Sequence, residues 1–127
     1  LYEKRNSPSH FLSGGEKRRL AIASILALGF ETIIMDEPYS NLDYAGVKDV
    51  NKLIGDLSAS GVTLVILTHE IEKCLALANK FMVLKKGCLV FDGTPLEGLS
   101  LGAETWEDWG IRNPLLSYPT LDSLVWK

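Results

Sequence analysis

The sequence ETIIMDEP at residues 31–38 decides the fold, because it joins a short apolar run to a pair of carboxylates and a proline. The run lies between a glycine and a proline, two residue types that interrupt regular structure, and it predicts a short buried strand over residues 31–36. Asp36 and Glu37 would then lie at the C-terminal end of that strand. In open α/β sheets this end of a strand faces the ligand.

Helices and strands alternate after this first strand. A helix is predicted from the N-cap residue Asp43, and residues 62–67 (VTLVIL) form a β-branched run that is typical of a strand covered on both faces. A short amphipathic helix over about residues 71–78 follows, and then a hairpin with strands at residues 81–84 and 88–91. This order predicts an α/β fold with a largely parallel sheet.

A glycine pair upstream opens a further helix. The sequence LSGGE contains Ser13 and Glu16 in capping-box spacing, so the helix is predicted to begin directly after Ser13. A helix N-terminus presents unpaired N–H groups and a partial positive charge, and Gly14 and Gly15 keep side chains away from them. The helix mouth therefore suits an anion such as phosphate, although a capped helix with glycines for packing would share this pattern.

Polar residues at the two strand ends form a candidate site. One of the carboxylates Asp36 and Glu37 can hold a hydrated Mg²⁺ ion, and the other can polarise an attacking water. The next strand leads to His69, and neighbouring parallel strands would bring His69 beside Glu37. Taken singly, the acidic pair could belong to a surface loop and the histidine could be structural. We interpret His10, which has no partner in the sequence pattern, as structural.

The composition is that of an ordinary globular domain. The 127 residues are 46% hydrophobic with a net charge of −3, and the basic residues form no stripe of the kind that binds nucleic acid. Cys74 and Cys88 lack metal-ligand spacing, and we interpret them as buried free thiols in a reducing compartment. The sequence contains no transmembrane run and no signal peptide. Because it opens on leucine, we expect it to be a piece of a longer protein.

Four motifs in a fixed order resemble the nucleotide-binding subunits of ABC transporters. Residues 12–16 (LSGGE) resemble the ABC signature, and residues 33–36 (IIMD) resemble Walker B. Residues 40–43 (SNLD) are similar to the D-loop, Glu37 stands in the place of the catalytic glutamate, and His69 stands in the place of the switch histidine. The resemblance implies a P-loop NTPase fold of the ABC ATPase type, with an α/β core of sheet and helices.

The resemblance implies an ATPase whose cofactors are ATP and Mg²⁺. Asp36 would hold Mg²⁺ through water, Glu37 would act as a base or position the water, and His69 would contact the γ-phosphate. The signature would face the ATP held by a second ATPase subunit, and the D-loop would couple the two sites. These residues are Ser13, Gly14, Gly15 and Glu16 in the signature and Ser40, Asn41, Leu42 and Asp43 in the D-loop.

The resemblance also implies partners and a place in the cell. The subunit would pair with itself or with a related subunit, and a transmembrane permease would hold it at the cytoplasmic face of the cell membrane as a peripheral protein. No nucleic-acid partner is expected. Ser7-Pro8 before the signature, together with the DEPxxxLD pattern, resembles the energy-coupling ATPases of cobalt, nickel and vitamin importers. Phe30, Tyr39 and Tyr44 depart from the residues that this family commonly has at those positions.

The P-loop of this family is missing from the sequence. Its GxxxxGK pattern requires a glycine followed by lysine, and no glycine of this chain has that neighbour. Residues 1–99 would therefore be the C-terminal part of an ATPase domain, followed by a tail over residues 100–127, and the chain alone would be inactive. The P-loop strand would lie between residues 62–67 and 81–84, so its absence leaves unpaired backbone. We expect the chain alone to self-associate, shift its pairing or swap an element.

Two other classes of protein share these motifs. One is the ATPase head of a chromosome-maintenance or DNA-repair protein, and the other is a soluble translation-associated ABC protein with two cassettes. The net charge of −3 and the DGTP sequence after the hairpin favour the transporter. The tail carries Trp106, Trp109 and Trp126 without periodicity, so it either packs on the domain or contacts a partner.

Overall fold

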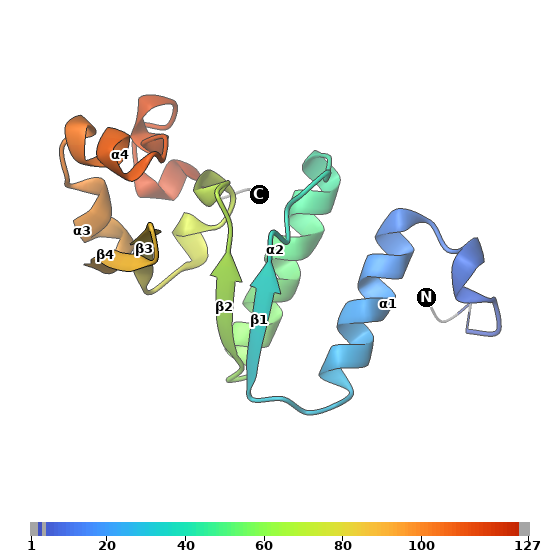
Figure 1. The fold of residues 1–127 in the computed structure, drawn as a ribbon. Coiled ribbons are helices and arrows are strands. Elements are labelled where there is room, and N and C mark those ends of the chain that lie inside the picture. The colour runs from blue at the N-terminus through green and yellow to red at the C-terminus, as the bar shows by residue number, and fades with distance from the viewer. Residues whose placement is uncertain (1–2, 4, 125–127) are drawn as a thin grey trace.

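The computed structural model describes residue 3 and residues 5–124 (Figure 1). The helices are α1 (Gly14–Leu26), α2 (Tyr44–Ala59), α3 (Pro95–Leu99) and α4 (Ala103–Trp109). The strands are β1 (Thr32–Asp36), β2 (Thr63–Leu67), β3 (Phe81–Lys85) and β4 (Cys88–Gly93). Short 3-10 turns lie before, between and after them: η2 (Ser9–Phe11), η3 (Ile71–Lys73), η4 (Leu75–Leu77), η5 (Pro114–Leu116) and η6 (Leu121–Leu124).

The centre of the molecule is a pair of parallel strands with one helix against it (Figure 1). Asp43 is the N-cap of α2, as the sequence predicts, and its carboxylate accepts a hydrogen bond from the Gly46 amide at 2.8 Å. Val47, Val50 and Ile54 follow at helical spacing and are buried in one cluster with side chains of both strands. This apolar stripe holds α2 against one face of the strand pair.

The opposite face of the strand pair is open. Successive side chains of a strand point to opposite faces, and Ile34 of β1, which points away from α2, is 67% exposed. Leu67 at the end of β2 is exposed as well. The prediction that residues 62–67 form a strand covered on both faces is therefore wrong. Parallel strands are ordinarily buried on both sides, and here the second covering layer is missing from the described residues.

β3 and β4 form a separate antiparallel hairpin. Lys86 and Gly87 at its turn have φ of 50° and 79°, the left-handed backbone that the tight two-residue turns of hairpins require. The predicted hairpin is thus confirmed, but the single, largely parallel sheet is not. The described strands form two sheets of two strands each, and β2 and β3 are not paired with one another. Each of them therefore presents an edge to which a further strand could bind.

The tail packs on this hairpin. Trp106 of α4 is 1% exposed and stacks on Phe81 of β3, with ring centroids 5.8 Å apart. Trp109 packs against the same cluster, whose buried members are Ile71, Leu75, Phe81, Val83, Leu99, Trp106 and Leu124. Of the two interpretations of the tail, packing on the domain is the one observed for Trp106 and Trp109. Trp126 lies outside the described residues.

Two local predictions are wrong. The amphipathic helix predicted over residues 71–78 is replaced by the turns η3 and η4, because Cys74 between them has a φ of −132°, which interrupts helical geometry. Cys88 is exposed and not buried, since it lies at the first residue of β4, directly after the hairpin turn. Cys74 is half-buried.

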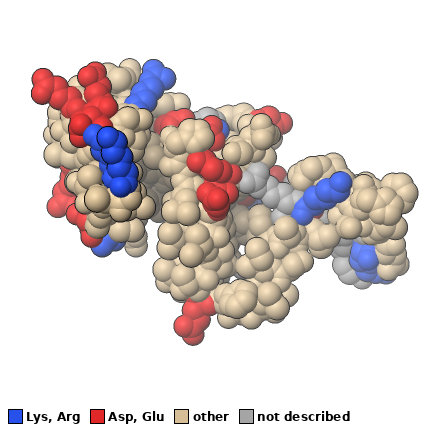
Figure 2. Space-filling view, viewed as in Figure 1, with Lys and Arg blue, Asp and Glu red and all other residues tan. Residues whose placement is uncertain are grey.

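The surface adds two observations. In the part of the chain that the structure describes, no helix is both long enough and apolar enough to cross a bilayer. Figure 2 shows acidic side chains gathered over the C-terminal elements, while the basic side chains on that face are scattered among other residues. The described residues on the face drawn therefore form no continuous basic stripe.

We predict that the 127-residue chain associates with itself in solution, because its strand pair has an open apolar face and β2 and β3 have unpaired edges. Sedimentation velocity should show a weight-average coefficient that rises with protein concentration. Ile34→Lys should weaken this rise, because it places a charge on the open face. The matched control Ser58→Lys adds the same charge on an exposed position of α2 and should leave association unchanged. A wild-type chain that remains monomeric and unfolds cooperatively on heating would contradict the prediction.

Candidate functional site

The register of β1 and β2 places the candidate site. The strands pair from Thr32 with Thr63 to Asp36 with Leu67, so both end at the same level. The amide of Glu37 extends this pairing by donating to the carbonyl of Leu67 at 2.8 Å. The residues that come after each strand are therefore side by side, as the sequence predicts for Glu37 and His69.

The carboxylate of Glu37 is the hydrogen-bonding centre of this strand end. Its Oε1 atom lies 2.7 Å from Nδ1 of His69 and accepts from the His69 amide at 3.2 Å. Its Oε2 atom accepts from the Thr68 hydroxyl at 2.9 Å. Thr68 in turn accepts from the amide of Glu70 at 3.0 Å, which fixes the hydroxyl. These hydrogen bonds thus form one connected network that involves only residues of this chain.

The ionisation of the pair follows from these contacts. The hydrogen bond from His69, supported by the Thr68 hydroxyl and the His69 amide, lowers the pKa of Glu37 against a smaller opposing effect of burial. The hydrogen bond to Glu37 and the charge of Glu37 raise the pKa of His69, and Glu70 and Glu72 add to this rise. An ionised carboxylate can only accept, so Nδ1 of His69 carries the proton and Nε2 remains available to a ligand.

The backbone of Glu37 is held in an unusual conformation. Its φ is 44°, in the left-handed region that residues other than glycine rarely adopt. Such a conformation costs of order 1–3 kcal/mol and persists only where the surroundings enforce it. The next two residues, Pro38 and Tyr39, are both buried, so the chain beyond Glu37 is anchored in the core. The strained backbone directs the carboxylate toward the end of β2.

Asp36 is exposed at the last residue of β1, beside the Glu37 network. Among the described residues, no group of three or more His, Cys, Asp and Glu side chains is arranged to hold a metal ion. A cation here would therefore depend on one or two carboxylates and on ligands from elsewhere. Mg²⁺ fits this donor set, since it keeps several of its waters and is commonly bound by one or two carboxylates together with substrate phosphates.

The helix mouth predicted from the glycine pair is present at the start of α1. The amide of Ser13 donates to Glu16 Oε2 at 2.9 Å and the amide of Glu16 donates to Ser13 Oγ at 3.3 Å, which completes the predicted capping box. The first amide that donates within the helix is that of Lys17, to the carbonyl of Ser13 at 2.9 Å, so the amides of Gly14 and Gly15 have no acceptor within the helix. A side chain at Gly14 would meet no atom within 4 Å, so the space before the helix is open.

The D-loop residues lie between β1 and α2. Ser40 and Asn41 are exposed, and Asn41 has a φ of 58°. Leu42 is half-buried, and Asp43 is the N-cap of α2. None of these four side chains belongs to the hydrogen-bond network of the Glu37 carboxylate.

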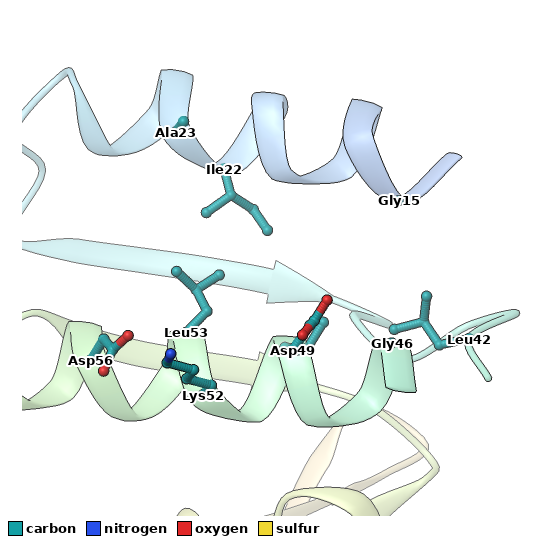
Figure 3. A pocket seen from close by; sticks show the side chains of 10 residues that line it. Gly15, Ile22, Ala23, Leu42, Gly46, Asp49, Lys52, Leu53 and Asp56 are labelled. Carbon is teal, nitrogen blue, oxygen red and sulfur yellow. The ribbon is translucent and has the colours of Figure 1, made fainter. Parts of the chain in front are cut away.

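A groove of about 540 Å³ runs between α1 and α2 and joins the signature to the D-loop. Gly15 of the signature and Leu42 of the D-loop both line it (Figure 3). Figure 3 also shows Ile22 of α1 and Leu53 of α2 pointing toward one another across the groove. The structure therefore forms one close cluster, Glu37 with His69, and sets the signature helix apart from it (Figure 1).

Sequence reasoning missed three residues that contribute to this site. Thr68 donates to Glu37, and a signal was available, because Thr68 directly follows β2 and precedes His69. Tyr39 and Asn51 form a buried hydrogen bond behind the Glu37 loop. The signal for Asn51 was a polar residue on the apolar stripe of α2.

Comparisons with known proteins place these motifs in context. No family model matches the chain. The energy-coupling factor transporter ATP-binding protein EcfA of Methanococcus maripaludis is 40% identical over 111 residues, which are 87% of this chain and 40% of that protein. The cobalt import ATP-binding protein CbiO of Rhodobacter capsulatus is 40% identical over 116 residues, which are 91% of this chain and 41% of that protein.

Solved structures that resemble this chain also include transporter proteins. CbiO1 from Clostridium perfringens, part of the ABC transporter complex CbiONQ, superposes with a TM-score of 0.66 and 33% identity. The match covers 89% of this chain and 43% of that chain. The chain thus spans about 40% of the length of the curated relatives it matches, and corresponds to roughly their C-terminal half.

We predict that His69 titrates above the usual histidine value and that Glu37→Gln returns it toward that value, because the substitution removes the carboxylate charge. Two-dimensional NMR of the imidazole across a pH series measures this. The control Glu72→Gln removes a charge that has a smaller effect on the pKa of His69 and should move that pKa less. A titration of His69 that is unchanged by Glu37→Gln would contradict the contact.

The pH range of the contact follows from the direction of each shift. Because folding raises the pKa of His69, the contact stabilises the folded chain fully at a pH below the pKa that His69 has in the unfolded chain. This stabilisation is lost as the pH rises through the pKa of His69 in the folded chain. Because folding lowers the pKa of Glu37, the stabilisation that its carboxylate provides is present at a pH above the pKa that Glu37 has in the unfolded chain. It is lost as the pH falls through the pKa of Glu37 in the folded chain. The contact should therefore be fully formed at about pH 5–6, between the usual carboxyl and imidazole values.

Proposed function

This chain belongs to the ABC ATPase family, and from that membership we propose that it supplies the catalytic glutamate and the switch histidine of an ATP-hydrolysing subunit that drives solute transport across a membrane. The fold class and the resemblance drawn from the four motifs are confirmed by these relatives. The observation that carries the proposal is the Glu37–His69 contact of 2.7 Å at the ends of two paired parallel strands.

Glu37 is suited to positioning water. Its carboxylate accepts three hydrogen bonds and its pKa is lowered, which makes it a weak base. A weak base is poorly suited to removing a proton from water before the attack. An ionised carboxylate in a fixed position can instead orient the water by accepting a hydrogen bond from it. We therefore assign Glu37 to orienting the attacking water.

His69 is suited to contacting the γ-phosphate. With Nδ1 held by Glu37, the imidazole presents Nε2 outward, and the side chain is 79% exposed. The raised pKa favours the protonated ring, whose Nε2–H would donate to a phosphate oxygen. Glu37 thus orients His69 and increases its positive character at the same time.

Asp36 would hold Mg²⁺ through water at the end of β1. When bound, the ion would neutralise charge on the phosphates of ATP. Asp36 is exposed and directly precedes Glu37 in the chain, so a hydrated cation could reach its carboxylate from solvent.

The second half of the proposal concerns the facing subunit. The signature residues Ser13, Gly14, Gly15 and Glu16 would contact ATP held by that subunit, through the open helix mouth of α1. The D-loop residues Ser40, Asn41, Leu42 and Asp43 would lie at the interface between the two. The groove that Gly15 and Leu42 both line supports a connection between these two motifs.

The relatives guide the remaining assignments. Two of them are an energy-coupling factor ATPase and a cobalt import ATPase, so we assign the transport to import of a metal ion or vitamin. A transmembrane permease and a second ATPase subunit would be the partners, at the cytoplasmic face of the membrane. The transporter names of these relatives favour this function over a DNA-repair head or a translation-associated protein.

We predict that the 127-residue chain binds no Mg·ATP, because it lacks the P-loop that would hold the phosphates. Isothermal titration calorimetry up to millimolar nucleotide should give only heats of dilution, for the wild type and for Glu37→Gln alike. Saturable heat would contradict this division of labour and would point to the Gly14–Gly15 amides. In that case Ser13→Ala should weaken nucleotide binding, because it removes the side chain that caps the start of α1.

We predict that the chain supports hydrolysis once a P-loop is supplied. A suitable protein is a chimera in which this chain replaces the 111 matching residues of EcfA from Methanococcus maripaludis. Glu37→Gln in the chimera should lower kcat by about 10²-fold with little change in KM, as expected when the reacting water and His69 lose the carboxylate that orients them.

The control for this experiment is Glu31→Gln, the same substitution at an exposed residue just before β1. It should leave kcat unchanged. A chimera that hydrolyses ATP equally well with glutamine at position 37 would contradict the assignment of Glu37.

A further inference from the structure

Asn51 is the one buried polar or charged residue among those the structure describes, and it lies in the middle of α2 with 8% of its surface exposed. The Tyr39 hydroxyl donates to Asn51 Oδ1 at 2.7 Å. Asn51 Nδ2 donates to the backbone carbonyl of Lys73 at 2.8 Å. Two hydrogen bonds thus connect three segments: the loop after β1, helix α2 and the turn η3 after β2.

The direction of both hydrogen bonds is fixed by chemistry. The Lys73 carbonyl can only accept, so the amide nitrogen of Asn51 must face it. Oδ1 then faces Tyr39, whose hydroxyl must donate. Tyr39 has no exposed surface, and burial raises its pKa, so the hydroxyl remains a neutral donor. In this apolar cluster an unmade hydrogen bond would be costly, so both hydrogen bonds are favoured in the folded chain.

Both ends of this connection lie close to the candidate site along the chain. Tyr39 is two residues beyond Glu37, and Lys73 is four residues beyond His69. The left-handed backbone of Glu37 must be enforced by the residues after it, and Tyr39 is the fully buried residue among them. The amide of Ser40 also donates to the Glu37 carbonyl at 3.2 Å, which closes the loop between them.

We propose that Tyr39 and Asn51 are positioning residues for Glu37 and His69. Their hydrogen bonds to one another and to the Lys73 carbonyl, which we name the Tyr39–Asn51 clamp, hold the loop after β1 against the turn after β2. The strand register alone brings the two loops together, and the clamp fixes how they face one another. The catalytic consequence of the clamp rests on the proposed function, whereas its effect on the Glu37–His69 contact does not.

The alternative is that these bonds only stabilise the core. The two roles differ in what a paired apolar substitution does. Tyr39→Phe alone leaves Asn51 Oδ1 unsatisfied, and Asn51→Leu alone leaves both the Tyr39 hydroxyl and the Lys73 carbonyl unsatisfied, so each should destabilise the chain. The double variant removes both side-chain polar groups and leaves only the Lys73 carbonyl without its donor, so it should be more stable than Asn51→Leu. If the bonds only stabilise the core, the Glu37–His69 contact should be restored in the double variant together with the stability. If they position the site, it does not.

The first readout is the tautomer of His69 in the 127-residue chain. Long-range ¹H–¹⁵N NMR at a pH above the titration of His69 should show the proton on Nδ1 in the wild type, because Glu37 accepts it. In Tyr39→Phe and in the double variant, at least half of the population should carry the proton on Nε2, the usual preference of a neutral imidazole. The control Val47→Ala shortens a buried side chain of the same cluster and should keep the Nδ1 proton.

The second readout is catalysis in the chimera with EcfA. Tyr39→Phe should lower kcat about tenfold and leave KM for Mg·ATP unchanged, because the site is misaligned and nucleotide binding is not touched. Val47→Ala should leave kcat unchanged at a temperature where both variants are folded.

Each result supports or overturns the proposal. A wild-type tautomer in both Tyr39→Phe and the double variant would overturn the clamp. An altered tautomer with unchanged kcat in Tyr39→Phe would overturn its catalytic consequence. Unchanged hydrolysis in His69→Ala would instead overturn the proposed role of His69, and the tautomer of the Tyr39→Phe chain would still decide the clamp.

Discussion

The register between β1 and β2 is the constraint on which the rest of the structure depends. Because Asp36 pairs with Leu67, the residues that leave both strands do so at one level, and the Glu37 amide continues the pairing to Leu67. A slip of one residue would move His69 away from Glu37 and would turn every apolar side chain of one strand to the wrong face. The buried stripe of α2 excludes that slip, because it packs only against the side chains that the observed register presents.

The same strand pair explains what the chain lacks. One face is covered by α2 and the other is open at Ile34, while β2 and β3 remain in separate sheets. The site does not depend on the absent covering layer, since its network spans the ends of β1 and β2 and needs no third strand. The signature helix behaves differently. It is fully capped, yet it stands across a groove from α2 and faces open space at Gly14. The chain therefore contains one formed site and one open helix mouth, which the proposed function assigns to the nucleotide of this subunit and to that of a partner subunit.

Features set by short-range hydrogen bonding could be predicted from the sequence. The Ser13–Glu16 capping box, the Asp43 N-cap and the turn at Lys86 and Gly87 depend on residues within four positions of one another, and all are present. The family and the fold class also followed from short motifs. The exposure of Cys88 and the open face of the strand pair could not be predicted, because they depend on which layers cover a strand. The Thr68–Glu37 bond and the Tyr39–Asn51 bond join segments that are distant along the chain, and no local pattern indicates that such segments meet.

If the proposed function is correct, the contact between Glu37 and His69 also governs how the site would respond to a bound nucleotide. Glu37 holds Nδ1 of an exposed imidazole, and the opposite nitrogen, Nε2, points outward. A phosphate oxygen would therefore bind to a different atom of the ring from the one that Glu37 binds, and the two contacts would not compete. Negative charge on both sides would raise the pKa of the ring further and strengthen both hydrogen bonds. A bound phosphate would thus tighten the geometry that the strand register creates, and Glu37 would become a still weaker base as its partner became more positive. This coupling favours a carboxylate that orients water over one that removes a proton.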